Sequence, residues 1–143
     1  MTDTTMLEKI YIKYAALRAE AKEDCAWDKT KLDATGFNVT MCISKWINKK
    51  CEWNMKSREF EMKRLKIYRQ LYDFYDTESP KKLSTKTEYE LFITSDSGYV
   101  NCFNESATIK EVVEYIESVI KLLKDKQWEV KNYVEYQKFI NGR

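Results

Sequence analysis

Cationic and aromatic side chains concentrate between residues 38 and 76. This segment holds nine Lys and Arg against five Asp and Glu, whereas the whole chain has a net charge of only +2. Spaced cations can neutralise the phosphates of a nucleic acid, and aromatic rings can stack on its bases. The candidate phosphate contacts are Lys45, Lys49, Lys50, Lys56, Arg58, Lys63, Arg64, Lys66 and Arg69, and the candidate stacking residues are Tyr68 and Tyr72. The segment is therefore a candidate surface for a polyanion.

The same charges have a second interpretation. Lysines and glutamates recur at steps of three and four residues, at Lys45, Lys49, Glu52, Lys56, Glu59, Lys63 and Lys66. On a helix such neighbours stabilise each other by about 0.2 to 0.5 kcal/mol a pair, so the stripe can be an ordinary solvated face. Spacing alone favours this interpretation. It also places Trp46 and Trp53 in the core, because both lie on the apolar side of the segment.

The sequence lacks the residues of most catalytic and metal sites. It has no histidine, its four cysteines form no CxxC pair, and it contains no GxSxG, P-loop or GxGxxG string. We therefore predict a protein that is not an enzyme and needs no metal or cofactor. Free thiols favour a reducing, cytoplasmic compartment, and we expect neither a leader peptide nor a membrane span of about 20 apolar residues.

The hydrophobic pattern predicts a mainly α-helical single domain, residues 1–143. Its parts are an N-terminal helical segment (1–36), a long basic helix (37–79, helical at about 38–76), a linker with a small β-hairpin (80–104, strands at about 88–103) and C-terminal helices (105–143). The hairpin is expected because TEYELFI alternates and Asp96 to Gly98 offer turn chemistry. The C-terminal helices are expected to begin at a capping box of Thr108 and Glu111.

Apolar faces on two helices predict self-association. The long helix carries a mostly apolar seam in alternating steps of four and three residues, at Val39, Ile43, Trp46, Lys50, Trp53, Ser57, Phe60, Arg64, Ile67, Leu71 and Phe74. At about 1.5 Å per residue the helix would be roughly 60 Å long, so we expect another chain beside it. The C-terminal region carries a second apolar face, predicted to drive oligomerisation, at Ile109, Val112, Val113, Ile116, Val119, Ile120 and Leu123. We therefore predict a ring-shaped homo-oligomer in which the positive charge of each subunit is repeated.

Several strings resemble the UvsY family of recombination mediators from T-even and related bacteriophages. DKTKLDATGFNVTMCISKWINKK is similar to the N-terminal half of that family, with Thr30, Lys31, Leu32, Asn38, Val39, Ser44, Lys45, Trp46, Asn48 and Lys49 in matching places. LYDFYD, LFITSDSGYVNC and KQWEVKN resemble later family elements, so the similarity covers about residues 28–143. The Lys-Ala-Arg-Leu motif of the family falls on Arg69, Gln70, Leu71 and Tyr72, where only the first cation is kept. Lys63, Arg64 and Lys66 are substitutes one turn earlier.

The resemblance implies a helical ring of six or seven subunits that binds single-stranded DNA without sequence specificity. It implies that the protein displaces the phage single-strand-binding protein and promotes loading of a RecA-like recombinase in recombination, repair and replication, in the cytoplasm of the infected host cell. The resemblance also assigns oligomerisation to the C-terminal region, which adds Trp128 to that surface. The alternative is an oligomeric scaffold that bridges proteins without touching DNA. A membrane-surface role is disfavoured because Lys50 and Arg64 interrupt the apolar seam.

Overall fold

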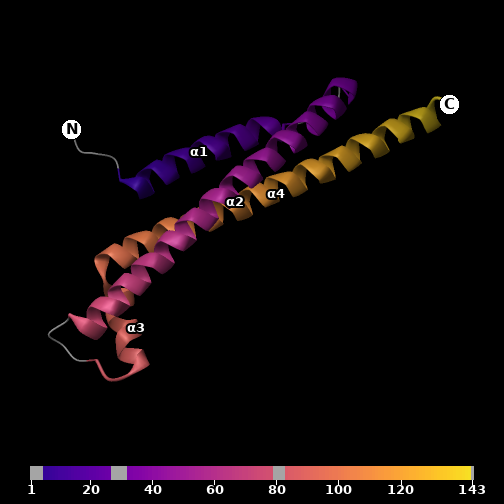
Figure 1. The fold of residues 1–143 in the computed structure, drawn as a ribbon. Coiled ribbons are helices and arrows are strands. Elements are labelled where there is room, and N and C mark those ends of the chain that lie inside the picture. The colour runs from indigo at the N-terminus through magenta and orange to yellow at the C-terminus, as the bar shows by residue number, and fades with distance from the viewer. Residues whose placement is uncertain (1–4, 27–31, 79–82, 143) are drawn as a thin grey trace. The chain divides into compact units, whose positions relative to one another are not determined.

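The computed structural model describes residues 5–26, 32–78 and 83–142, and within these ranges all regular structure is α-helical (Figure 1). The helices are α1 (Met6–Asp24), α2 (Leu32–Thr77), α3 (Lys86–Ser95) and α4 (Ser97–Ile140). The predicted N-terminal and long central helices are confirmed, although α2 begins at Leu32, before the predicted start at residue 37. Thr30 and Lys31, which contributed to the family resemblance, lie outside the described residues.

The predicted β-hairpin at 88–103 is wrong, because those residues belong to α3 and to the start of α4. Thr85 caps α3 by accepting a hydrogen bond from the amide of Glu88 at 3.2 Å. The Glu88 carboxylate in turn accepts from the amide of Ser84 at 2.9 Å. These contacts satisfy amides that a helix start would leave unpaired, so they favour a helix over the alternating pattern of TEYELFI.

Asp96, expected as a turn residue of the hairpin, instead caps α4. Its side chain accepts hydrogen bonds from the amides of Gly98 at 2.9 Å and Tyr99 at 3.2 Å. As a result α4 begins at Ser97 and not at the predicted capping box. Thr108 lies inside the helix, where its hydroxyl donates to the carbonyl of Asn104 at 2.7 Å.

The chain divides into two compact units, Met1–Tyr11 with Asn54–Glu111, and Ile12–Trp53 with Val112–Arg143. In the second unit, parts of α1, α2 and α4 form a three-helix core. Its buried apolar side chains are Leu17, Ala21, Val39, Trp46, Trp53, Val112, Val113, Ile116, Val119, Ile120, Leu123 and Val130. Here the seam of α2 packs within its own chain, whereas we expected a partner chain to cover it.

Polar contacts fix the helix directions in the second unit. Thr40 accepts a hydrogen bond from Gln127 at 3.1 Å, and Lys50 is paired with Glu117 at 3.6 Å, so α2 and α4 are antiparallel. Lys126 is buried and donates to the carbonyl of Cys25, just beyond the end of α1, at 2.6 Å. A cation at that position satisfies a carbonyl that the end of the helix leaves free.

The first unit contains the C-terminal half of α2, all of α3 and the beginning of α4. Ile93 of α3 is fully buried, and Ile109, Tyr99 and Cys102 of α4 are buried with it. Aromatic contacts join α3 to α2, with ring centroids 5.7 Å apart for Tyr75 and Phe92. Within the described ranges, no helix is both long enough and apolar enough to cross a bilayer.

The three-helix core can be tested at Ile116, which is fully buried on α4. We expect Ile116→Ala to lower the free energy of unfolding by about 2 to 5 kcal/mol, because it removes buried methyl groups and leaves a cavity. Urea denaturation measures the change. Leu122→Ala is the control on the same helix, since Leu122 is 59% exposed and the expected loss is under about 1 kcal/mol. Equal losses in the two variants would contradict the described core.

Candidate nucleic-acid interface

The first predicted cations on α2 are neutralised by α1. The ammonium of Lys45 lies 3.0 Å from the carboxylate of Glu20 and 2.6 Å from that of Asp24, and Lys49 lies 3.1 Å from Glu20. Asp24 also accepts a hydrogen bond of 2.8 Å from the indole nitrogen of Trp46. Two carboxylates of α1 therefore form ion pairs with cations that we predicted to contact phosphates.

Electrostatics strengthens these pairs. Burial alone would lower the pKa of Lys45, but its hydrogen bonds to Asp24 and Glu20 outweigh that effect and raise the pKa. Burial likewise opposes the charge of Asp24, yet hydrogen bonds from Lys45 and Trp46 lower its pKa. Since Lys50 is paired with Glu117 of α4, all three predicted cations of this region carry a partner.

A second charged cluster surrounds Glu61 in the first unit. Its carboxylate pairs with Arg64 on the same helix, accepts a hydrogen bond from Ser106 at 3.0 Å and pairs with Lys110 at 3.2 Å. The Arg64 guanidinium also donates to the Tyr99 hydroxyl at 2.8 Å. Arg64, predicted to contact DNA, is therefore held between α2 and α4.

The cluster shifts both charged partners further toward their ionised forms. Hydrogen bonding from Arg64, with smaller contributions from Ser106 and Lys110, lowers the pKa of Glu61 to about 2. The hydrogen bond to Glu61 raises the pKa of Arg64, so both pKa shifts favour the charged forms of the pair. Because residues three apart share a helix face, the cluster turns this side of α2 toward α4.

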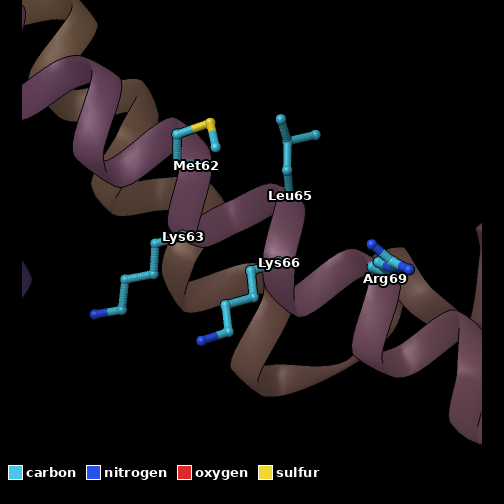
Figure 2. Close-up of a pocket in the computed structure, with 5 residues that line it drawn as sticks. All are labelled: Met62, Lys63, Leu65, Lys66 and Arg69. Atoms are coloured by element: carbon cyan, nitrogen blue, oxygen red, sulfur yellow. The ribbon is translucent and has the colours of Figure 1, made fainter.

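Another side of α2 carries an open groove lined by Met62, Lys63, Leu65, Lys66 and Arg69, with a volume of about 510 Å³ (Figure 2). All five side chains are exposed. Its three cations make no ion pair with any residue in the described part of the chain. Of the predicted phosphate contacts, the structure thus brings these three together on one accessible surface.

The two remaining predicted cations lie earlier on α2. Arg58 is exposed and has no ion pair within the described ranges, whereas Lys56 is half-buried and engages a neighbouring group. Lys63 also lies over the ring of Phe60, with its ammonium 5.6 Å from the ring centroid. This contact leaves the ammonium without a carboxylate partner.

The predicted stacking residues differ in accessibility. Tyr68 is half-buried and meets Tyr99 edge to face, with centroids 5.9 Å apart. Tyr72 is 43% exposed and stacks on Tyr89 of α3, with centroids 4.8 Å apart. Tyr89 is anchored in turn by a 3.1 Å hydrogen bond from its hydroxyl to Asp76. Tyr72 is therefore the better placed of the two to meet a base.

The predicted oligomerisation residues fall into two groups. Seven are buried within the single chain, namely Ile109, Val112, Val113, Ile116, Val119, Ile120 and Leu123. Trp128 is 61% exposed, and the ammonium of Lys131 lies 5.8 Å from its ring centroid. Further large apolar side chains are exposed near the end of α4, at Tyr136, Phe139 and Ile140. The role of the predicted surface in assembly stays a prediction.

The sequence alone did not reveal the carboxylates that pair with some of the predicted cations and leave others unpaired. Glu20, Asp24 and Glu117 reach α2 from other helices, and their partners are invisible without the fold. The apolar groove residues, Met62 and Leu65, did leave a signal, because they interrupt the polar face of α2 away from its seam.

A family model described as "Recombination, repair and ssDNA binding protein UvsY" matches residues 20–143. The chain belongs to the UvsY family. The resemblance noted in the sequence is thereby confirmed, and the general role of the chain lies in recombination and repair with binding of single-stranded DNA. A comparison with curated proteins gave no match.

Crystal structures of the bacteriophage T4 recombination mediator protein UvsY share the fold. Lattice type IV aligns with a TM-score of 0.79 at 18% identity, covering 88% of this chain and 97% of the T4 chain. Lattice type II gives 0.80 at 18% identity, covering 89% and 96%. Lattice type I gives 0.77 at 19% identity, covering 87% and 98%. At such identity the likeness shows the fold alone, so the roles of UvsY-family residues in this chain rest on its own geometry.

The Glu61 cluster predicts a pH-dependent contribution to stability. Because folding lowers the pKa of Glu61 from 4.5 to about 2, its stabilisation is complete above pH 4.5 and is lost as the pH falls toward 2. We expect Glu61→Gln to reduce the free energy of unfolding at pH 7, and the deficit to shrink below pH 4.5. Denaturant titrations between pH 7 and pH 2 measure both effects.

The matched control for this test is Glu59→Gln, which makes the same charge change at an exposed position of α2 without an ion pair in the described structure. We expect Glu59→Gln to leave the free energy of unfolding nearly unchanged at every pH. A deficit of Glu61→Gln that does not vary with pH would show that the ion pairs of the cluster contribute nothing and that only its shape matters.

Proposed function

We propose that the chain is a recombination mediator that binds single-stranded DNA along the groove of Lys63, Lys66 and Arg69 on α2. The observation that supports this site is the contrast among the predicted cations. Lys45, Lys49, Lys50 and Arg64 are engaged by carboxylates, whereas the three cations of the groove are exposed and unpaired within the described chain. Phosphates are attracted most strongly where positive charge is not already compensated.

The chemistry of the groove suits a flexible strand of any sequence. Ammonium and guanidinium groups neutralise phosphates, which are identical at every nucleotide, so such contacts fix position and do not read bases. The exposed ring of Tyr72 lies about one turn beyond Arg69, where it can stack on any base because every base has a π-face. Binding should therefore depend on salt and be insensitive to sequence.

Assembly extends this groove into a longer path. In a ring of six or seven copies, each subunit adds its unpaired cations to the same anionic strand, so a modest surplus per chain becomes a strong collective field. A strand held in this way competes with the phage single-strand-binding protein and is presented to a RecA-like recombinase. The mediator thus acts by displacing the first protein and promoting loading of the second.

A scaffold that bridges proteins without touching DNA is the second candidate. The exposed side chains near the end of α4 favour it, because Trp128, Tyr136 and Phe139 give a helix surface rich in aromatic residues, which are enriched at protein interfaces. This function requires no free cations on α2. The unpaired groove therefore favours the mediator.

The charge-removing variant Lys63→Gln, Lys66→Gln, Arg69→Gln tests the proposed site. We expect affinity for a single-stranded oligonucleotide to fall by roughly tenfold or more at low salt. The magnitude of the slope of log K against log salt should decrease by about 2 for each bound chain, since each lost phosphate contact contributes about 0.7. Fluorescence anisotropy across a salt series measures both quantities.

The control variant is Lys121→Gln, Lys124→Gln, Lys138→Gln, which removes equal charge from exposed positions of α4. It should change affinity by less than about threefold through the general field. If both variants lose affinity equally, net charge and not the groove governs binding. If neither loses affinity, the groove is not the binding site.

A further inference from the structure

Two exposed apolar side chains line the groove beside its cations. Met62 is 67% exposed and Leu65 is 49% exposed, and neither belongs to the buried core. Single exposed apolar residues are ordinary on protein surfaces, but these two lie one turn apart and share their groove with three cations. A ligand that fits this groove would have both an anionic side and an apolar side.

We propose that Met62 and Leu65 contact the faces of unstacked bases and make this site select single-stranded over double-stranded DNA. The inference rests on the proposed function, because it assigns the groove to DNA and then names what the apolar residues add. In this proposal, Met62 and Leu65 determine the preference of the site for single-stranded over double-stranded DNA.

The geometry separates the groove into two edges. Figure 2 shows Lys63 and Lys66 extending to one side of α2, while Met62 and Leu65 extend to the other, and Arg69 continues the groove along the helix. A single strand has the same division, with phosphates along one side and free bases along the other. The cationic edge therefore matches the phosphates and the apolar edge matches the bases.

A duplex cannot use both edges in this way. Its bases are stacked and paired inside the helix, so it presents phosphates and groove edges but no open base faces. Aliphatic side chains such as Leu and Met do contact bases in complexes where stacking is interrupted, and the flexible, polarisable thioether of Met adapts to varied surfaces. A single strand, whose bases are already unstacked, therefore gains more from Met62 and Leu65 than a duplex, which would first have to be unstacked.

Charge complementarity favours this occupant over a second copy of the chain. None of the five residues lining the groove is acidic, and its three cations carry no counter-charge within the described residues. An apolar protein partner would have to cover these cations without neutralising them, which costs desolvation energy. A polyanion with exposed apolar faces satisfies both edges at once.

The test is the variant Met62→Gln, Leu65→Gln in the full chain, compared with wild type for a single-stranded oligonucleotide and a duplex of equal length. We expect single-strand affinity to fall roughly tenfold and duplex affinity to change less than about twofold, because only open bases reach the apolar edge. The salt slope should stay unchanged, since no phosphate contact is removed. Met41→Gln, Ile47→Gln is the matched control, with side chains 58% and 42% exposed on the same helix.

Other outcomes identify which idea fails. If the charge-removing variant weakens single-strand binding but Met62→Gln, Leu65→Gln does not, or if single-strand and duplex affinity fall in parallel, only the selectivity inference is overturned. If the charge-removing variant has no effect, the proposed site itself is wrong. If Met62→Gln, Leu65→Gln lowers the light-scattering mass while binding per chain is kept, the apolar edge is a contact between copies and the inference is also wrong.

Discussion

The carboxylate of Glu61 decides which side of α2 faces water in the first unit. Its contacts with Ser106 and Lys110, and the contact of its partner Arg64 with Tyr99, attach one side of the helix to α4. Because of the helix period, Lys66, two residues after Arg64, then lies on another side of α2. The groove is thus a geometric consequence of an ion cluster that itself has no free charge to offer a phosphate.

Ion pairs with other helices also determine which of the remaining cations of α2 are compensated. The surplus of cations over carboxylates between residues 38 and 76 is a property of the sequence, but the field that a ligand meets depends on which cations are compensated in space. Glu20 and Asp24 compensate Lys45 and Lys49, so a phosphate would have to displace an existing partner there. In the groove, no carboxylate of the described residues would have to be displaced. Evenly spaced cations on one helix therefore differ in whether a carboxylate already compensates them.

Local signals in the sequence predicted the fold best where tertiary partners mattered least. Helical periodicity was sufficient for α1 and α2, whereas a hairpin was expected where a Thr-x-x-Glu capping box at Thr85 begins α3. The same signature at Thr108 misled, because a threonine inside a helix can bond to the preceding turn instead. Asp96 also has two readings, as a turn residue and as a helix cap, and only the chain on both sides decides between them. The ion pairs that join different helices could not be predicted, because their partners are far apart in the sequence, whereas Glu61 and Arg64 are only three residues apart.

The way α2 is covered also limits the surfaces that the proposed assembly could use. In the second unit, α1 and α4 of the same chain bury Trp46 and Trp53 of α2, so the proposed assembly would have to use apolar side chains that remain outside the core. One such set lies near the end of α4, at Trp128, Tyr136, Phe139 and Ile140, whereas the groove lies on the first-unit half of α2. The two surfaces share no residue and belong to different compact units. An assembly built on the first surface would therefore use none of the residues that line the groove.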